Sequence, residues 1–511
     1  MKKFKSTLSL VLALIMIFSC CSVALGANTA ITKPDATQYP QVVVTGFGSA
    51  KIYYEDDPEQ TSLFHPWVLD RFVDNLANIP EYIVKSIKNK EPNLFYTCVY
   101  NYLMDCFGML AYKPDGSMMD GVTIEPTTLF QDEDGRYIFK YDSRQSPVVL
   151  APQLHDYIQQ VMEHSGKDKV ELVGISYGAN VASAYIHLYR NDLSHIDSIN
   201  LRVPSIGGVD YLGELMSGEF DVSAIGLCDL LHRFIGAGII PDFFYLMEEA
   251  GILAPFIDAM LEPAMQYALY RAARDVARDA VATLPALWVC LPDKYFESAL
   301  EYMYGENYRD PDHEFAKLIS DMTYYHYEIA NHAEELYRDI QDEVHLSIIV
   351  KYGVAAIPLT DGPNTMEDGF VPVPVASFGA TCTTYGAQLP ADYVQQKYTD
   401  YNFINPERSI DASTGIVPFT TWYLRGLEHS ETSTGYQDIV DNIVHRNLTV
   451  FSDPEYPQYM TVLEDDHNVL VPVTEEEEEE TLYQKFWKVF KAIVLFPKKV
   501  MDKIKEVLSL G

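Results

Sequence analysis

Short apolar runs alternate with amphipathic helical patterns along this chain, and no other feature restricts its fold as strongly. Five runs have the composition of buried strands, namely residues 42–45, 137–141, 170–175, 199–203 and 346–352. Helical patterns, with apolar residues at every third or fourth position, occupy residues 154–162 and 181–189. Because strands that alternate with helices form parallel sheets covered on both faces, we predict an α/β fold with a central, mostly parallel sheet.

A long, mostly helical stretch interrupts this alternation. Residues 210–340 contain helical patterns at 264–284 and 314–340 and are rich in tyrosine, methionine and phenylalanine. We interpret this stretch as a helical cap inserted into the sheet domain. The predicted organisation is a signal peptide (1–26), the first part of the sheet core (27–209), the cap (210–340), the second part of the core (341–470), an acidic linker (471–480) and basic amphipathic C-terminal helices (481–511).

The chain as a whole is strongly acidic, whereas its N-terminus is basic. The sequence has 37 basic and 73 acidic residues, a net charge of −36, and it therefore lacks the basic footprint of a nucleic-acid-binding protein. Residues 1–26 combine Lys2, Lys3 and Lys5 with an apolar run and a small-residue cleavage site, as secretory signals do, and an uncleaved anchor is the alternative. We therefore expect a secreted or extracytoplasmic protein that does not bind nucleic acid.

The C-terminal segment 481–511 is also basic, with seven lysines against two acidic residues. Its apolar residues recur at helical spacing on the face opposite several of the lysines, and Pro497 breaks or kinks the pattern. Such segments lie on anionic membrane surfaces, which makes a membrane a candidate partner. Docking on the acidic body of the same chain, or on a second copy, is the alternative interpretation.

Cysteines contribute no recognisable framework. The five that follow the signal peptide are Cys98, Cys106, Cys228, Cys290 and Cys382. This odd and sparse set excludes a disulfide scaffold and contains no CxxC spacing for a metal. We predict buried free thiols, with a small loop closed by Cys98 and Cys106 as the alternative.

The strongest chemical signal is the pentapeptide Gly174-Ile175-Ser176-Tyr177-Gly178. It follows the predicted strand at 170–173 and precedes a predicted helix at 180–188. This is the strand–turn–helix context of a G-x-S-x-G nucleophile, in which small residues flank the serine because the backbone and the helix crowd together. Ser176 is therefore the candidate nucleophile, and a turn with only a packing role is the alternative.

A nucleophilic serine also needs donors that stabilise an oxyanion. The early strand at 42–45 runs into Gly46-Phe47-Gly48-Ser49, where the glycines allow the backbone to approach a substrate closely. The backbone amides of Phe47 and Tyr177 are the candidate donors of this oxyanion hole. A plain turn would use the same glycines.

These motifs resemble those of the lecithin:cholesterol acyltransferase and lysosomal phospholipase A2 family of α/β-hydrolases. Four segments resemble its PG-x-x-G loop, its Y-D-W-R segment, its D-G-T-V-P motif and its late x-E-H segment, namely Gly46-Phe47-Gly48-Ser49, Tyr141-Asp142-Ser143-Arg144, Asp368-Gly369-Phe370-Val371-Pro372 and Gly426-Leu427-Glu428-His429. The resemblance implies Asp368 as the triad acid and His429 as the base, in the order Ser176, Asp368, His429. It covers residues 40–445 discontinuously, and Thr45 and Ser143 replace the family's proline and tryptophan.

Other residues compete for the roles of acid and base. Asp361 also follows the strand at 346–352, and Glu367 is the neighbour of Asp368; we favour Asp368 because Val371 and Pro372 complete its motif. His429, His445 and His467 are the histidines that follow Asp368. We favour His429 because it precedes a helical pattern at 436–444, whereas His445 falls at the end of that pattern.

The function expected from these residues is that of a secreted serine hydrolase acting on carboxylic esters of lipid-like substrates, as a lipase, phospholipase or esterase. The triad would act through an acyl-enzyme and requires neither a cofactor nor a metal. Alternatives with the same triad are an acyltransferase and an amidase. A non-catalytic envelope protein that retains the fold is a third alternative.

Overall fold

The computed structural model describes residues 39–57, 62–63, 81–219, 263–354, 365–446, 448–463 and 466–474. The predicted signal peptide and the basic segment 481–511 lie outside these residues, as does Asp361. Within the described ranges, no helix is both long and apolar enough to cross a membrane.

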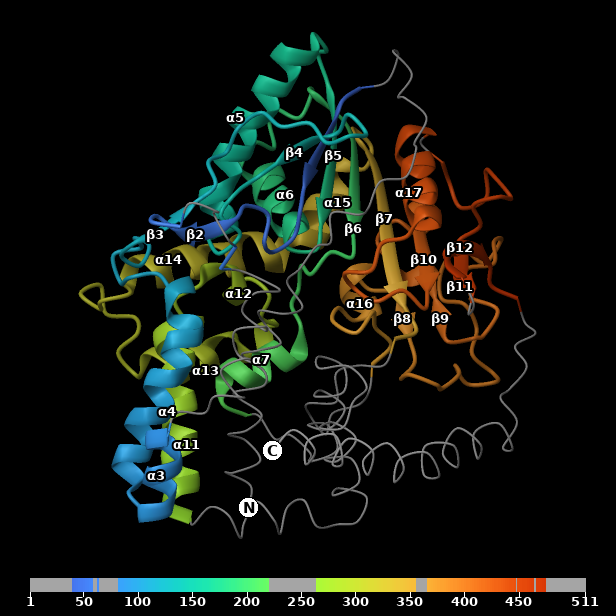
Figure 1. Ribbon diagram of the computed structural model, residues 1–511. Helices are drawn as coiled ribbons and strands as arrows, with labels where there is room; N and C mark the ends of the chain where they lie inside the picture. Colours follow the sequence, from blue (N-terminus) through green and yellow to red (C-terminus); the bar gives the residue numbers. More distant parts are fainter. Residues whose placement is uncertain are drawn as a thin grey trace, which may run out of the picture.

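An eight-stranded sheet forms the centre of the fold (Figure 1). Its order is β12-β11-β10-β7-β6-β5-β1-β4, and all neighbours are parallel except β11 and β12. The strands are β1 (Gln41–Val44), β4 (Tyr137–Phe139), β5 (Val170–Ile175), β6 (Ile196–Arg202), β7 (His345–Tyr352), β10 (Thr421–Arg425), β11 (Tyr459–Leu463) and β12 (Asp466–Pro472). Because the strands run in parallel, the loops that follow β1, β5, β7 and β10 meet at one edge of the sheet.

All five strands predicted from the sequence are present. They correspond to β1, β4, β5, β6 and β7, with bounds that differ by no more than a few residues, and β5 coincides with its predicted run. The strands β10, β11 and β12 have no counterpart among the predicted runs. Two small antiparallel pairs also lie outside the prediction, β2 (Ile52–Tyr54) with β3 (Val122–Ile124) and β8 (Thr381–Cys382) with β9 (Ile410–Asp411).

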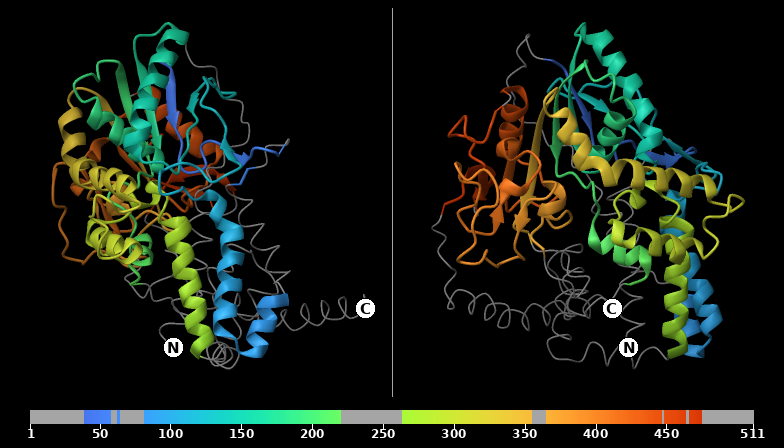
Figure 2. Two further views of the ribbon diagram at one scale, coloured as in Figure 1. Left: turned by 90° about the vertical axis from the view of Figure 1, so that its left-hand side faces the viewer. Right: turned by 180° about the vertical axis from the view of Figure 1, so that it is seen from behind.

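Helices cover both faces of the sheet (Figures 1 and 2). The helix α5 (Pro147–Ser165) packs against α6 (Tyr177–Leu188), and α15 (Ala333–Ile340) joins them through a hydrogen bond of 2.6 Å between Tyr337 Oη and Ser183 Oγ. The helix α17 (Thr434–Arg446) lies on the other face, against β7 and β12. The predicted helices at 154–162, 181–189 and 436–444 fall within α5, α6 and α17, except for one residue beyond the end of α6.

The helix α5 shows how local sequence sets these elements. Ser146 caps its N-terminus by accepting a hydrogen bond of 3.3 Å from the Val148 amide. Gly166 ends it in the left-handed conformation, at φ 67°. Between them, Leu150, Leu154, Ile158 and other apolar residues at helical spacing are buried, which fixes the face that α5 turns to the core.

Most of the described helices outside the sheet core lie between the neighbouring strands β6 and β7. They are α7 (Asp210–Ser217), α11 (Pro263–Val276), α12 (Pro285–Trp288), α13 (Asp293–Tyr304), α14 (Ala316–Tyr324) and α15, together with two π-helical turns, η2 (Ala277–Val281) and η3 (Tyr325–Ile329), and the 3₁₀ turn η4 (Ala330–His332). The helices α3 (Glu81–Asn89) and α4 (Pro92–Phe107), which precede β4, pack beside α11 and extend away from the sheet (Figure 2). The cap boundaries at 210 and 340 remain predictions.

A strand–turn–helix unit, β5 to α6, lies near the middle of this mostly parallel sheet, with helices on both faces and a helical insertion. This arrangement is the α/β-hydrolase fold. The remaining described elements are short, and they are η1 (Gly108–Leu110), α16 (Val373–Ala376), η5 (Ala412–Thr414) and η6 (Pro418–Thr420).

Candidate active site

Ser176 occupies a sharp turn between β5 and α6. Its backbone has φ 53° and ψ −121°, in the positive-φ half of conformational space that residues other than glycine rarely adopt. The turn is held by two backbone hydrogen bonds, from the Ser176 amide to the Arg202 carbonyl at 2.8 Å and from the Ala179 amide to the Ser176 carbonyl at 2.9 Å. Strained backbone of this kind persists only where its surroundings fix it, and it concentrates at functional sites.

The two glycines of the pentapeptide are required by their neighbours. A Cβ atom on Gly178 would lie 1.9 Å from the carbonyl oxygen of Val44 at the end of β1. A Cβ atom on Gly174 would lie 2.9 Å from Cα of Ala179 in α6. The motif is therefore fixed by close approaches of β1 and α6 to the turn, as the sequence predicts.

His429 lies in the loop between β10 and α17 and reaches the serine. Its Nε2 atom is 2.8 Å from Ser176 Oγ, and its Nδ1 atom is 2.7 Å from Asp368 Oδ2. A carboxylate only accepts hydrogen bonds, so Nδ1–H donates to Asp368 and Nε2 accepts the serine hydroxyl. The three predicted residues thus form one continuous chain of hydrogen bonds, assembled from the loops after β5, β7 and β10.

Asp368 is held in place by the loop that carries it. Its side chain is buried, with 1 % exposure, and its Oδ1 atom accepts hydrogen bonds from the amides of Phe370 at 2.9 Å and Val371 at 2.7 Å. The His429 amide donates to the Asp368 carbonyl at 2.9 Å, which joins the two loops through their backbones as well. Both carboxylate oxygens therefore have partners, and only Oδ2 faces the imidazole.

The competing candidates take other positions. Glu367 is buried next to Asp368, but the His429 imidazole bonds to Asp368. His445 is the penultimate residue of α17, and His467 lies in β12; their side chains lie outside the described part of the structure. Among the described residues, no group of three or more His, Cys, Asp or Glu side chains could hold a metal ion.

Phe47 and Tyr177, the candidate oxyanion donors, lie side by side. Their rings stack with centroids 4.6 Å apart and planes at 22°. Tyr177 is the first residue of α6, and the first amides of a helix have no acceptor within it. The Phe47 amide donates to no other described residue. Two amides without described acceptors therefore flank the turn that carries Ser176.

Ser143 supports the loop that carries Phe47, a role that sequence reasoning missed. The Gly48 amide donates a hydrogen bond of 2.8 Å to Ser143 Oγ, and the Tyr141 hydroxyl donates to the Thr45 carbonyl on the other side of the loop. Ser143 is buried, with 2 % exposure. In the sequence, Ser143 stands out only as the loss of an aromatic residue, because its contact lies 95 positions away in the chain.

We expect Ser143→Ala to lower kcat for hydrolysis by about tenfold with little change in KM, because a displaced oxyanion donor costs less than a deleted one. The measurement is steady-state kinetics on a soluble ester, with Ser143→Thr as the control that keeps the hydroxyl. A kcat equal to that of the wild type in Ser143→Ala would show that this hydrogen bond does not position the loop.

The neighbouring residues Asp142 and Arg144 form a buried ion pair. Arg144 Nε lies 2.8 Å from Asp142 Oδ1, and Arg144 Nη2 lies 2.7 Å from Asp142 Oδ2. The Arg144 side chain is 1 % exposed and the Asp142 side chain 7 %. Burial by itself raises the pKa of Asp142, but the charge and hydrogen bonds of Arg144 outweigh it, so the net pKa lies below its usual range. Arg144 Nη1 also donates to the Leu110 carbonyl at 3.0 Å. This segment therefore has a structural role.

The free cysteines agree with the prediction where the structure describes them. Cys98 and Cys290 are buried free thiols, and Cys382 is a partly buried one. Burial raises the pKa of the Cys290 thiol to about 12, which keeps it protonated at neutral pH.

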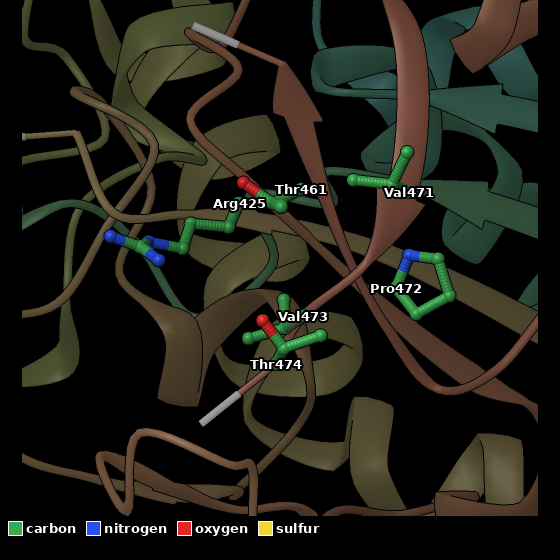
Figure 3. Close-up of a pocket in the computed structure, with 6 residues that line it drawn as sticks. All are labelled: Arg425, Thr461, Val471, Pro472, Val473 and Thr474. Carbon is green, nitrogen blue, oxygen red and sulfur yellow. The ribbon is translucent and has the colours of Figure 1, made fainter. Parts of the chain in front are cut away.

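A pocket of about 400 Å³ lies at the far end of the sheet (Figure 3). It is lined by Arg425, Thr461, Val471, Pro472, Val473 and Thr474. The Arg425 guanidinium is paired with Glu407 at 2.7 Å, so the charge in this pocket is already neutralised. Ser176, Asp368 and His429 do not line it.

Comparison with known proteins identifies no family for this chain beyond its fold. No family model matches the sequence, and no curated protein matches it. A solved structure with some similarity is MGS-M2, an alpha/beta hydrolase enzyme from a Medee basin deep-sea metagenome library. It shares 12% identity over 57% of this chain and 92% of that chain, with a TM-score of 0.15, a likeness too small to carry an argument. The resemblance to the lecithin:cholesterol acyltransferase and lysosomal phospholipase A2 family stays a prediction, and the chain is described by its α/β-hydrolase fold.

Proposed function

We propose that this protein is a serine hydrolase that cleaves carboxylic esters of lipid-like substrates. The observation that carries the proposal is the hydrogen-bonded chain from Asp368 through His429 to Ser176, which ends on a strained turn. A serine in a mere packing turn would not need an oriented imidazole and a buried carboxylate behind it. The lipid-like substrate class rests on the family resemblance of the four sequence motifs.

The reaction follows from the positions of these atoms. His429 Nε2 takes the Ser176 proton while Oγ attacks the ester carbonyl carbon, and Asp368 stabilises the imidazolium that forms. The amides of Phe47 and Tyr177 donate to the oxyanion of the tetrahedral intermediate. The intermediate collapses as His429 gives its proton to the leaving alcohol, which leaves an acyl group on Ser176. Water, activated by His429, then releases the acid and restores the serine.

A panel of soluble and lipid-like substrates tests this function. It comprises p-nitrophenyl esters from acetyl to palmitoyl, p-nitroanilides with the same acyl groups, and each ester with a long-chain alcohol added as acceptor. We expect ester hydrolysis that increases with acyl length and little anilide cleavage. Faster cleavage of anilides would indicate an amidase, and formation of the alkyl ester would indicate an acyltransferase. No turnover of any substrate by the folded protein would contradict the proposal.

The proposed site of action is outside the cytoplasm. Residues 1–26 would direct export, and residues 481–511 would attach the protein to an anionic membrane surface, on the basis of their charge and apolar patterns. A lipid-like substrate and a membrane-bound enzyme are consistent with one another.

A further inference from the structure

Lys351 is a buried lysine in the middle of the sheet. It is the next-to-last residue of β7, and its side chain is 2 % exposed. Lysine is rarely buried to this extent unless its ammonium group is fully paired. Its surroundings therefore need to supply acceptors.

All three acceptors come from the loop that carries His429. Lys351 Nζ lies 3.1 Å from the Glu428 carbonyl oxygen, 2.9 Å from that of His429 and 2.6 Å from that of Glu431. An ammonium group has three N–H donors, so one donor is available for each carbonyl. The lysine thus gathers the backbone of residues 428–431 around a single charge.

Charged and aromatic groups lie near Lys351 on the elements that pack around it. The carboxylates of Asp368, Glu428 and Glu431 act on it from the loops, and Arg202 acts on it from the neighbouring strand β6. The ring of Tyr436 in α17 covers the ammonium group, with Nζ 4.7 Å from the ring centroid. The Arg202 side chain is itself buried and donates from Nε to Asn200 Oδ1 at 2.8 Å.

We propose that Lys351 is a positioning residue that clamps the 428–431 loop and so holds the His429 imidazole between Asp368 and Ser176. This inference rests on the proposed function of that site. The second anchor of the loop is the hydrogen bond from the His429 amide to the Asp368 carbonyl, at 2.9 Å. With both anchors in place, the imidazole has fixed neighbours at each nitrogen.

The clamp makes activity depend on the protonation of Lys351. Burial lowers the pKa of Lys351 to about 8, and Arg202 acts in the same direction, while the three carboxylates oppose the shift. The neutral amine above this pH has only two donors for three carbonyls. We therefore expect kcat to fall as the pH rises through about 8.

The stability of the fold should change in the opposite direction. The pKa of Lys351 is lower in the folded protein than the ordinary lysine value of 10.5, so the unfolded chain binds this proton more tightly. Between about pH 8 and 10.5 the Lys351 contribution to the free energy of unfolding therefore increases with pH. Deprotonation of Lys351 would therefore not itself unfold the protein, and a loss of activity that depends on Lys351 in this range would come from a released loop.

The test is the pH dependence of kcat and KM for a soluble ester, followed by acid release in a pH-stat, for the wild type and four variants. In Lys351→Met we expect kcat at pH 7 to fall by about 100-fold with KM little changed, and the decline near pH 8 to disappear. Lys351→Arg keeps its charge at every pH, so it should also lack the decline. Lys169→Met, which removes a half-buried lysine immediately before β5, should retain the decline.

Glu431→Gln provides the milder variant. It removes a carboxylate that raises the pKa of Lys351 and keeps an oxygen that can accept from the Glu428 amide. The decline of kcat should therefore move to lower pH. If the lysine variants do not fold, this shift alone tests whether Lys351 clamps the 428–431 loop.

The outcomes separate the two proposals. Wild-type protein with no turnover at any pH contradicts the hydrolase function itself. Ser176-dependent turnover without a decline near pH 8, or with a decline that is unchanged in Lys351→Met and Glu431→Gln, contradicts only the clamp.

Discussion

Replacing Ser176 by alanine is expected to lower kcat for ester hydrolysis by about a millionfold, since the nucleophile and its base act as one unit. No other described hydroxyl contacts His429, so no described side chain is placed to take over the attack. Initial rates on a soluble p-nitrophenyl ester measure the effect. The variant should unfold within a few degrees of the wild type, because it loses a single hydrogen bond, that between Ser176 and His429, which contributes about 1 kcal/mol.

The matched control is Ser298→Ala, an exposed serine of α13 that bonds only to the Tyr295 carbonyl. It should hydrolyse the ester at the wild-type rate. Turnover by Ser176→Ala within tenfold of the wild type would assign the activity to another group and refute the triad.

Asp368→Asn is expected to lower kcat by about 10⁴-fold while the fold stays intact. The reason lies in the fixed environment of this side chain. Its Oδ1 atom accepts from the Phe370 and Val371 amides, so an asparagine must keep its oxygen there and turn its amide group to His429. The amide would donate to Nδ1 and place the imidazole proton on Nε2, where it can no longer accept the Ser176 proton.

Glu367→Gln is the control for Asp368→Asn, because it removes the neighbouring carboxylate that the sequence left as an alternative. We expect it to retain most of the activity. A larger loss of kcat in Glu367→Gln than in Asp368→Asn would show that the acid has been assigned to the wrong residue.

Much of the fold could be predicted because its strands are local apolar runs. The unit from β5 to α6 is the clearest case, since a buried strand, a tight turn and a helix follow one another without interruption. The strands β10, β11 and β12 could not be predicted in the same way. They are short or mix polar with apolar residues, and their burial comes from neighbours such as β7 that are distant in the sequence.

The residues of the candidate site were predictable to different degrees. Ser176, Asp368 and His429 lie in motifs with distinctive neighbours, and the structure brings all three together. Lys351 is visible in the sequence as a single charge inside an apolar run. The run predicts the strand but gives no role to the lysine within it. Ser143 left none, because its contact with the Gly48 amide exists only after β1 and the segment beyond β4 have come together.

Covalent labelling with a fluorophosphonate tests the central claim most directly, because the probe reacts with a serine only when its base and its oxyanion donors are in place. Folded wild-type protein should acquire one phosphonyl group, located by mass spectrometry on Ser176 in the tryptic peptide 170–190. Ser176→Ala should acquire none, and Asp368→Asn should be labelled much more slowly. Folded wild-type protein that stays unlabelled, or that carries the adduct on another residue, would contradict the account.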